Sequence, residues 1–218
     1  MKRFSEVLSR PLRLLTTIIV SGWVVASAIA QPLEGVDYVP IPAQPLEFRN
    51  KIEVIEFFYY GCESCNRLEP HLQAWLKTLS PDVLFRRVPA LRRTAWVPLT
   101  RVYFALEQLG EIERMHTQIY QAVHDEGINL GVSSELFEWV QKKGIDRTKV
   151  EEVLDSDVVI AKVQQARDAT LAYGVRATPS FVVNGIYLTS PGMLRNSNAL
   201  FPTLEFLIEK VRLTQLPK

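Results

Sequence analysis

The spacing of apolar residues changes along the chain, and each change predicts a different kind of secondary structure. Residues 54–60 form a nearly continuous run of β-branched and aromatic side chains, which favours a buried strand. Between residues 68 and 79 the apolar positions instead recur every three or four residues, which predicts a helix with one buried face. Gly61 lies between the two segments and is followed directly by Cys62 and Cys65. The first cysteine is therefore expected at the N-terminus of a helix.

Later segments repeat this alternation of strand and helix patterns. Alternating apolar residues at 83–89 predict a second strand, parallel to the first because a helix between them supplies the crossover. Asn184-Gly185 lies between β-rich runs at 180–183 and 186–189, and such a pair is a strong hairpin signal. Helices are expected at 97–110, 112–125, 133–143, 147–155, 158–173 and 198–212. The chain is thus expected to have an α/β fold, with a mixed sheet flanked by helices and an inserted all-helical block.

The first 30 residues have the three parts of a secretory signal. A short basic segment precedes an apolar run at 14–30, and this run ends in the triplet Ala28-Ile29-Ala30. Because the triplet lies where the apolar run stops, we expect cleavage that leaves Gln31 as the first mature residue. An uncleaved membrane anchor is the alternative, and the run is at the short end of membrane-spanning lengths. The four prolines that follow between residues 32 and 45 predict an extended leader at 31–50, with a short edge strand at 38–41.

The charge balance gives no reason to expect a nucleic-acid partner. The chain has 25 Lys and Arg against 24 Asp and Glu, and removal of residues 1–30 takes away four basic residues and one acidic residue. The mature chain would then carry a formal charge of −2, with no basic excess to bind phosphates. We expect its basic cluster, Arg86, Arg87, Arg92 and Arg93, to be a solvated edge.

Cys62 and Cys65 are the only cysteines, and their position at a helix start favours a redox dithiol. Unpaired N–H groups and the positive end of the helix dipole should favour a thiolate at Cys62, and a thiolate is the attacking species in disulfide exchange. Cys65, one turn further along, is expected to be more buried and to act as the resolving thiol that closes a Cys62–Cys65 disulfide.

Two other uses of this cysteine pair are weaker hypotheses. As a structural cross-link, a four-residue loop would contribute only about 2 kcal/mol, against about 4.7 kcal/mol for a hundred-residue loop. A zinc site would need further ligands, and His116 and His124 are eight positions apart, outside the usual gap of three to five. We therefore expect no metal ion and no other cofactor. The remaining histidine, His71, is expected to be solvated or packed rather than catalytic.

Two longer motifs resemble those of a known family. They are Ile55-Glu56-Phe57-Phe58-x-x-x-Cys62-x-x-Cys65 and Ala177-Thr178-Pro179-x-Phe181-x-Val183-Asn184-Gly185. With the order of the expected elements, they resemble the thioredoxin fold over about residues 52–211, and in particular the DsbA branch of periplasmic thiol oxidases. The resemblance implies a thioredoxin-like domain at 51–96 and 175–218, with a helical insertion at 97–174.

The resemblance also implies roles for residues around the dithiol. Pro179 would be cis and would face the cysteines, and Thr178 would offer backbone polar groups to an extended substrate. Glu56 would be the family's buried acid beneath the site, because an acid in an apolar strand is costly unless it has a use such as proton relay to Cys65. The alternative for Glu56 is an edge-facing carboxylate. Further substrate-binding groups are expected at Tyr60, Glu63 and Ser64, beside an apolar groove near Tyr59.

One departure from the family pattern predicts a difference in chemistry. The strongest oxidants of the family have Cys-Pro-His-Cys, whereas here Glu63 and Ser64 separate the cysteines. A carboxylate beside Cys62 disfavours the thiolate, although its place in the first helical turn and a hydrogen bond from Ser64 partly offset this. We therefore predict a Cys62 pKa above that of the strongest oxidants, and a less oxidising disulfide.

The expected function is that of an exported thiol–disulfide oxidoreductase, which introduces disulfides into secreted proteins in the periplasm. The resemblance implies that its partners are thiol-containing exported polypeptides and a membrane quinone-linked reoxidant of the DsbB type. A monomer is expected, because nothing resembles the dimerisation domain of the isomerases. The alternatives are a disulfide reductase or isomerase that uses the same dithiol, and a non-catalytic module that holds peptides or a soft metal ion such as Cu(I).

Overall fold

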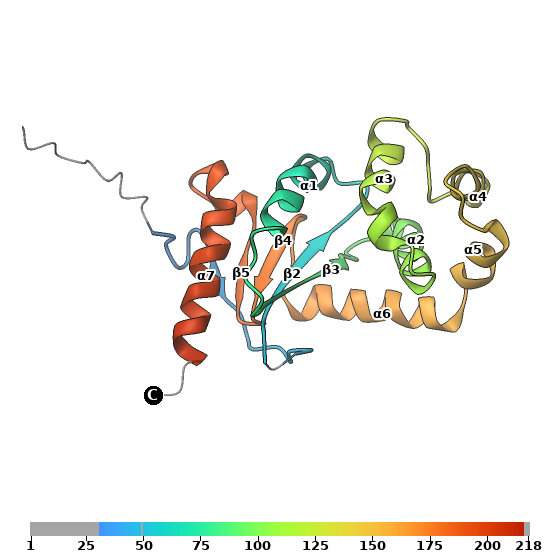
Figure 1. Cartoon of the computed structure of the whole chain (residues 1–218). Helices are drawn as coiled ribbons and strands as arrows, with labels where there is room; N and C mark the ends of the chain where they lie inside the picture. Colours follow the sequence, from blue (N-terminus) through green and yellow to red (C-terminus); the bar gives the residue numbers. More distant parts are fainter. Residues whose placement is uncertain (1–30, 49, 216–218) are drawn as a thin grey trace, which may run out of the picture. The chain divides into compact units, whose positions relative to one another are not determined.

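The computed structural model describes residues 31–48 and 50–215 (Figure 1). The predicted signal sequence, residues 1–30, lies outside the described residues. No helix in the described part of the chain is long and apolar enough to cross a membrane.

A five-stranded mixed sheet forms the centre of residues 31–215 (Figure 1). Its order is β1 (Val39–Pro40), β5 (Tyr187–Thr189), β4 (Ser180–Val183), β2 (Ile52–Phe58) and β3 (Val83–Pro89). β2 pairs in parallel with β3 and antiparallel with β4, as the sequence predicts. All seven residues of β2 are buried, because this strand has neighbours on both edges and helices on both faces.

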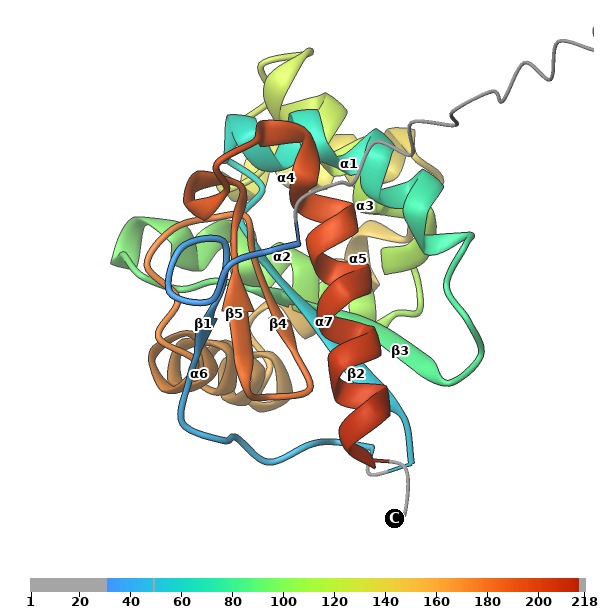
Figure 2. The same ribbon diagram turned by 90° about the vertical axis from the view of Figure 1, so that its left-hand side faces the viewer.

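Two hydrophobic clusters cover opposite faces of the sheet. On one face, α1 (Glu63–Leu76) and α7 (Leu200–Gln215) pack against alternate residues of β2 and β4, such as Val54 and Phe181. Figure 2 shows α7 lying across this face. On the other face, Ile55 and Phe57 belong to a second cluster that includes α6 (Asp157–Ala172) and the other inserted helices. The alternation of faces along β2 follows from the period of two in a strand.

The inserted block between β3 and β4 is entirely helical. A 3₁₀ turn (Thr94–Trp96) leads into α2 (Val97–Gln108), α3 (Ile112–His124), α4 (Ser133–Lys142), α5 (Arg147–Leu154) and α6. All five helices predicted between residues 97 and 173 are confirmed, with ends that differ by one or two residues. Their aromatic and aliphatic side chains, including Tyr103, Ile119, Tyr120 and Trp139, form the core of the block. Two further 3₁₀ turns, Pro191–Met193 and Ser197–Ala199, precede α7.

The predicted hairpin is confirmed. Asn184 and Gly185 are the central residues of the turn between β4 and β5, in which the Ile186 N–H donates to the Val183 carbonyl oxygen at 3.1 Å. Their φ values of 51° and 68° lie in the left-handed region that such a tight turn requires. A Cβ atom on Gly185 would also lie 2.8 Å from the carbonyl oxygen of Gln44, so the leader passes too close for any other residue. The turn therefore fixes the register of β4, the strand that follows Pro179.

Strand β2 ends at Phe58, two residues earlier than the apolar run at 54–60 predicts. Phe58 accepts a hydrogen bond from the N–H of Ala90 at 2.7 Å, the last bond between β2 and the chain after β3. Tyr59 and Tyr60 then belong to a turn, in which the N–H of Cys62 donates to the carbonyl oxygen of Tyr59 at 3.0 Å. This turn directs the chain into α1 and presents Cys62 at its start.

Candidate dithiol active site

Cys62 is the N-cap residue of α1, in the extended conformation that a cap requires. Its Sγ accepts a hydrogen bond from the backbone N–H of Cys65 at 3.4 Å. A hydrogen bond from the Cys65 thiol, aided by the backbone N–H groups of Ser64 and Cys65, lowers the pKa of Cys62 to about 5, although partial burial works in the opposite direction. An unperturbed thiol has a pKa near 8.5, so Cys62 is mainly a thiolate at neutral pH.

Cys65 has the opposite environment. Its side chain is buried, and burial raises the pKa of this thiol far above its usual range, with further contributions from the neighbouring Cys62 and Glu56. Both cysteines are free thiols in this structure. The pair therefore combines one reactive, partly exposed sulfur with one that is protonated and inaccessible, and the expected difference in burial is confirmed.

The loop before β4 lies against the reactive sulfur. The Thr178–Pro179 peptide bond is cis, as the resemblance implies, and the carbonyl oxygen of Thr178 lies 3.3 Å from Cys62 Sγ. β4 pairs with β2, and Cys62 follows shortly after β2, so the pairing of the two strands brings together residues 116 positions apart. Pro179 itself is buried, while Thr178 is partly exposed beside the sulfur.

Glu63 and Ser64 are exposed at the start of α1. Arg67 donates to a carboxylate oxygen of Glu63 at 2.9 Å and to the hydroxyl of Ser64 at 3.4 Å. The predicted hydrogen bond from Ser64 to Cys62 comes from the Ser64 backbone rather than from its side chain. Both side chains lie at the rim of the site.

The side chain of Tyr60, a predicted substrate-binding residue, is buried and does not line a surface groove. Its side chain is only 1% exposed, and its hydroxyl forms a hydrogen bond with His116 Nδ1 at 2.9 Å. Tyr59 is instead the partly exposed aromatic residue, stacked on Trp96 with ring centroids 4.2 Å apart. A Cβ atom on Gly61 would lie 2.5 Å from the Tyr59 ring, which explains the glycine at this position.

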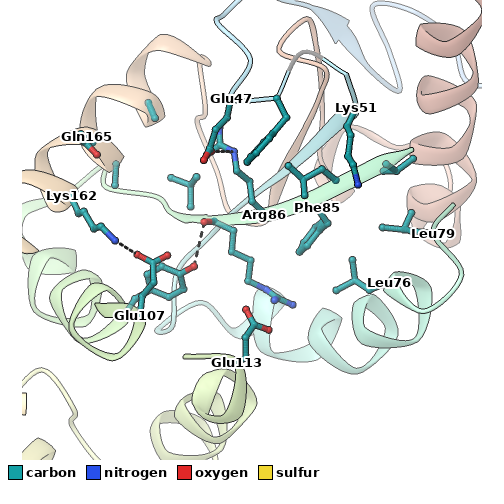
Figure 3. A pocket seen from close by; sticks show the side chains of 18 of the residues that line it. Glu47, Lys51, Leu76, Leu79, Phe85, Arg86, Glu107, Glu113, Lys162 and Gln165 are labelled. Atoms are coloured by element: carbon teal, nitrogen blue, oxygen red, sulfur yellow. Dashed lines mark hydrogen bonds and ion pairs between the residues drawn. The ribbon is translucent and has the colours of Figure 1, made fainter. Parts of the chain in front are cut away.

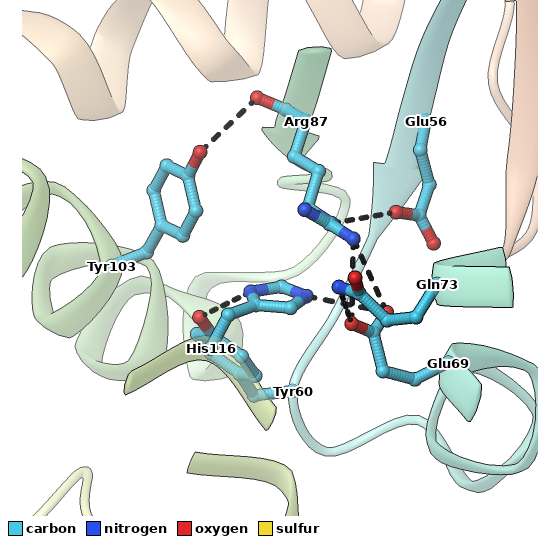
Figure 4. Close-up of polar contacts among 7 residues, drawn as sticks. All are labelled: Glu56, Tyr60, Glu69, Gln73, Arg87, Tyr103 and His116. Atoms are coloured by element: carbon cyan, nitrogen blue, oxygen red, sulfur yellow. Dashed lines mark hydrogen bonds and ion pairs between the residues drawn. The ribbon is translucent and has the colours of Figure 1, made fainter. Parts of the chain in front are cut away.

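A buried polar network lies beneath the dithiol (Figure 4). Glu56 of β2 is 1% exposed, and Arg87 of β3 contacts it at 3.2 Å (Nε to Oε2). The same guanidinium contacts Glu69 of α1 at 3.3 Å, and His116 Nε2 faces the other oxygen of Glu69 at 3.5 Å. Gln73 donates to Glu69 at 2.7 Å. Glu56 is therefore a buried acid with a cationic partner, and the edge-facing alternative is wrong.

The basic cluster is not the solvated edge that its composition predicts. Arg87 has a side chain only 9% exposed, and Arg86 contacts the buried Glu53 at 2.8 Å on the opposite face of β3. Consecutive residues of a strand point to opposite faces, and each arginine meets an acid that belongs to β2. Arg92 and Arg93 are exposed, as expected.

The two acids of the network are held in different protonation states. Burial raises the pKa of Glu56 to about 8, only partly offset by the charge of Arg87. Burial also acts on Glu69, but His116 and Arg87 outweigh it and lower the pKa of that carboxyl group. At neutral pH, Glu56 is thus mainly a neutral acid that can give up a proton, while Glu69 is the anion that balances Arg87.

The raised pKa of Glu56 makes stability depend on pH. Between pH 5 and 8 the folded protein keeps a proton on Glu56 that the unfolded chain has lost, so this residue contributes a fall in stability as pH rises. Glu56→Gln cannot ionise. We expect its unfolding free energy to match wild type at pH 4.5 and to exceed it by about 1–3 kcal/mol at pH 8. Urea denaturation across this range measures the difference, and parallel pH profiles would contradict it.

A groove of about 910 Å³ lies along β3, away from the dithiol (Figure 3). Its walls come from the leader, the end of α1, and helices α2, α3 and α6. Lys162 and Glu107 pair across one side of it, and the hydroxyl of Tyr103 donates to the carbonyl oxygen of Arg87 at 3.4 Å. None of the predicted site residues lines this groove.

Sequence reasoning missed four residues of the site: Glu69, Arg87, His116 and His124. A signal existed for Glu69, because it lies four residues after Cys65 and three before Leu72, on the buried face of the predicted helix. His124 contacts the Tyr60 carbonyl oxygen and the Glu63 carboxylate, 61 positions from the latter. Residues so far apart in the sequence form no local pattern from which their contact could be predicted.

The sheet order, the cis proline beside the sulfur and the cysteine pair at a helix start together define a dithiol protein of the thioredoxin fold. Residues 87–199 match the family model described as the DSBA-like thioredoxin domain. The thiol:disulfide interchange protein DsbA of Azotobacter vinelandii is 34% identical over 182 residues, which cover 83% of this chain and 85% of that protein. DsbA of Bordetella pertussis is 34% identical over 188 residues, covering 86% of this chain and 90% of its own.

Solved structures of DsbA proteins are also similar to this chain. A crystal structure of Pseudomonas aeruginosa DsbA superposes with a TM-score of 0.79 at 31% identity, covering 84% of this chain and 95% of that one. The DsbA structure from Xylella fastidiosa gives a TM-score of 0.78 at 31% identity, covering 84% of this chain and 98% of its own. This chain belongs to the DSBA-like thioredoxin family, and it is a protein thiol–disulfide oxidoreductase.

Proposed function

We propose that the protein works as an oxidase: its Cys62–Cys65 disulfide is transferred to pairs of thiols in exported polypeptides. The observation that carries this proposal is the position of Cys62 as the N-cap of α1, where the backbone N–H of Cys65 donates to its Sγ at 3.4 Å and the pKa of the thiol is lowered to about 5. A stabilised thiolate stabilises the reduced form of a dithiol protein relative to its disulfide, so the disulfide is more readily given away. The names of the relatives, thiol:disulfide interchange proteins, support exchange chemistry of this kind.

The reaction begins with the attack of a substrate thiolate on Cys62 Sγ of the disulfide. The bond between the two enzyme sulfurs breaks, a mixed disulfide forms between substrate and Cys62, and Cys65 leaves as a thiolate. Because the pKa of buried Cys65 is strongly raised, this sulfur must take up a proton. We propose that Glu56 donates this proton. It is mainly a neutral acid at pH 7, and its ionised form would repel a Cys65 thiolate.

A second substrate thiolate then attacks the substrate sulfur of the mixed disulfide. Cys62 leaves as its stable thiolate, the substrate has lost two electrons and gained a disulfide, and the enzyme is left as a dithiol. The low pKa of Cys62 makes it the better leaving group in this step. Cys65 would reverse the first step if the second thiolate did not arrive.

We propose that the substrate lies beside the Thr178–Pro179 loop. Thr178 places a backbone carbonyl oxygen at the reactive sulfur, where an extended chain could pair with it. Exposed Glu63 and Ser64 at the start of α1, and the Tyr59–Trp96 stack, border the same space. This arrangement would bind many unfolded sequences, because backbone groups rather than a specific pocket supply the contacts.

The setting that fits this activity is the periplasm, reached by export that a cleaved signal sequence at residues 1–30 would direct. A mature chain that starts with the leader at 31–50 would act as a monomer and would need a reoxidant. We propose a membrane quinone-linked protein of the DsbB type, which would accept two electrons from the Cys62–Cys65 dithiol. The helical insertion at 97–174 would cover the buried side of the dithiol against water.

The test is disulfide transfer to a reduced peptide with two cysteines. One equivalent of the oxidised protein is mixed with the peptide at pH 7, the reaction is quenched with acid, and masses are recorded. We expect the peptide to lose two hydrogen atoms and the protein to gain two, whereas Cys65→Ser, which cannot form the intramolecular disulfide, should leave the peptide reduced. A protein that leaves the peptide reduced, and that instead reduces a disulfide peptide to completion, would be a reductase.

A further inference from the structure

His124 is the last residue of α3 and reaches the start of α1, where the reactive cysteine lies. Its Nε2 lies 2.7 Å from the carbonyl oxygen of Tyr60, and its Nδ1 lies 3.1 Å from Oε2 of Glu63. The side chain is only 12% exposed. One imidazole from the helical insertion thus contacts both the turn that precedes Cys62 and the residue that follows it.

Both contacts are with groups that accept hydrogen bonds and cannot donate them. A carbonyl oxygen has no proton, and an ionised carboxylate has none either. A neutral imidazole has a hydrogen on one nitrogen only, whereas the imidazolium has one on each. The ion pair with Glu63 therefore forms in addition to the Tyr60 contact when both ring nitrogens carry a hydrogen. His116 differs, since the Tyr60 hydroxyl can donate to its Nδ1 and a neutral ring suffices there.

Arg67 is the other cation that contacts Glu63, and it binds the second carboxylate oxygen at 2.9 Å. Its side chain is 65% exposed, so water and salt screen this pair strongly. The histidine lies in a less solvated position, with the Tyr120 ring 6.1 Å away on its own helix. Of the two cations, His124 should therefore do more to cancel the negative charge of Glu63 near the sulfur.

We propose that His124 is a positioning residue for the exchange reaction, which acts through Glu63: it holds this carboxylate in a neutralised pair and fixes the Tyr60–Cys62 turn, so that the adjacent thiolate is not repelled. The inference rests on the proposed function, in which Cys62 is the exchanging sulfur. It explains how an acid can stand directly after that sulfur, and it gives the helical insertion a chemical role.

The test compares the Cys62 pKa in wild type and in His124→Gln, by thiolate absorbance at 240 nm in the reduced, full-length mature protein. Glutamine keeps an N–H that can donate to the Tyr60 carbonyl oxygen but carries no charge. We expect the Cys62 pKa to rise by about 0.5–1 unit. Because the reduced form loses this stabilisation, the equilibrium constant for reduction by glutathione should fall about 3- to 10-fold.

Two further variants separate the charge effect from a structural one. In a Glu63→Gln background the carboxylate is gone, so adding His124→Gln should leave the Cys62 pKa within about 0.2 unit of the single Glu63→Gln variant. Arg67→Gln is the matched control, because it removes the exposed cation from the same carboxylate, and we expect it to shift the Cys62 pKa by less than half as much as His124→Gln. Circular dichroism and thermal melts verify that each variant is folded.

An unchanged Cys62 pKa in folded His124→Gln would overturn the proposal. An equal rise with and without the Glu63 carboxylate would also overturn it, since His124 would then not act through Glu63. These outcomes differ from a failure of the proposed function, which would appear in wild type as absent disulfide transfer. The thiolate titration needs no substrate, so it tests the role of His124 independently of disulfide transfer.

Discussion

Cys62→Ser is expected to lower the rate of disulfide exchange by more than about 1,000-fold, because the hydroxyl group of serine cannot form the mixed disulfide. The structure makes this residue the one accessible sulfur of the pair, since Cys65 is 1% exposed. The measurement is reduction of insulin disulfides by dithiothreitol, with and without catalytic amounts of protein, followed by turbidity. The variant should show the uncatalysed rate.

Cys65→Ser is the matched control for this prediction. It retains the reactive sulfur, so it should still attack a disulfide and accumulate as a covalent complex with insulin, which non-reducing gels or mass spectrometry detect. If Cys62→Ser kept wild-type catalysis while Cys65→Ser lost all covalent capture, the assignment of the two sulfurs would have to be reversed.

Arg87→Met is expected to destabilise the protein by about 3–5 kcal/mol at pH 7, the usual cost of leaving a buried charge without its partner. Arg87 has a side chain 9% exposed and balances Glu69 while it contacts Glu56. Methionine retains an apolar stem and removes the guanidinium group, so the loss reports mainly on charge. Urea denaturation at pH 7 gives the unfolding free energies.

The pH dependence and a triple variant test the electrostatic cause. The loss in Arg87→Met should shrink near pH 4, where the carboxyl groups take up protons. Glu56→Gln and Glu69→Gln in the same chain should restore most of it at pH 7, because no buried charge then lacks a partner. Arg212→Met is the control, since this arginine pairs with Asp82 and Glu209 at the surface. A loss below about 1 kcal/mol in Arg87→Met would show that the network contributes little.

Much of the fold follows from the sequence, because its elements are encoded by local patterns. The three- to four-residue spacing that predicts the inserted helices reflects faces that are in fact buried, such as Met115, Ile119 and Ala122 of α3. The Asn184-Gly185 turn was predictable because only residues that tolerate positive φ fit there. The position of Cys62 at a helix start followed from the change in period on either side of Gly61.

The charges beneath the site could not be predicted from local patterns. Arg86 and Arg87 are adjacent in the sequence and have the composition of a surface cluster, but their partners, Glu53 and Glu56, lie on another strand. The burial of Tyr60 has a related cause: whether an aromatic residue after a strand faces solvent depends on what covers it, and here His116 of α3 does. Segments far away in the sequence decide whether such charged and aromatic residues are buried. The spacing of apolar residues along the chain carries no information about those segments.

The cap of α1 and the buried Cys65 hold Cys62 as a thiolate. Absorbance at 240 nm, recorded for the reduced protein from pH 3 to 10 and corrected with Cys62→Ser, measures this directly. We expect a transition with a midpoint near pH 5 that disappears in the variant. A midpoint near 8.5, the value of an ordinary cysteine, would contradict it.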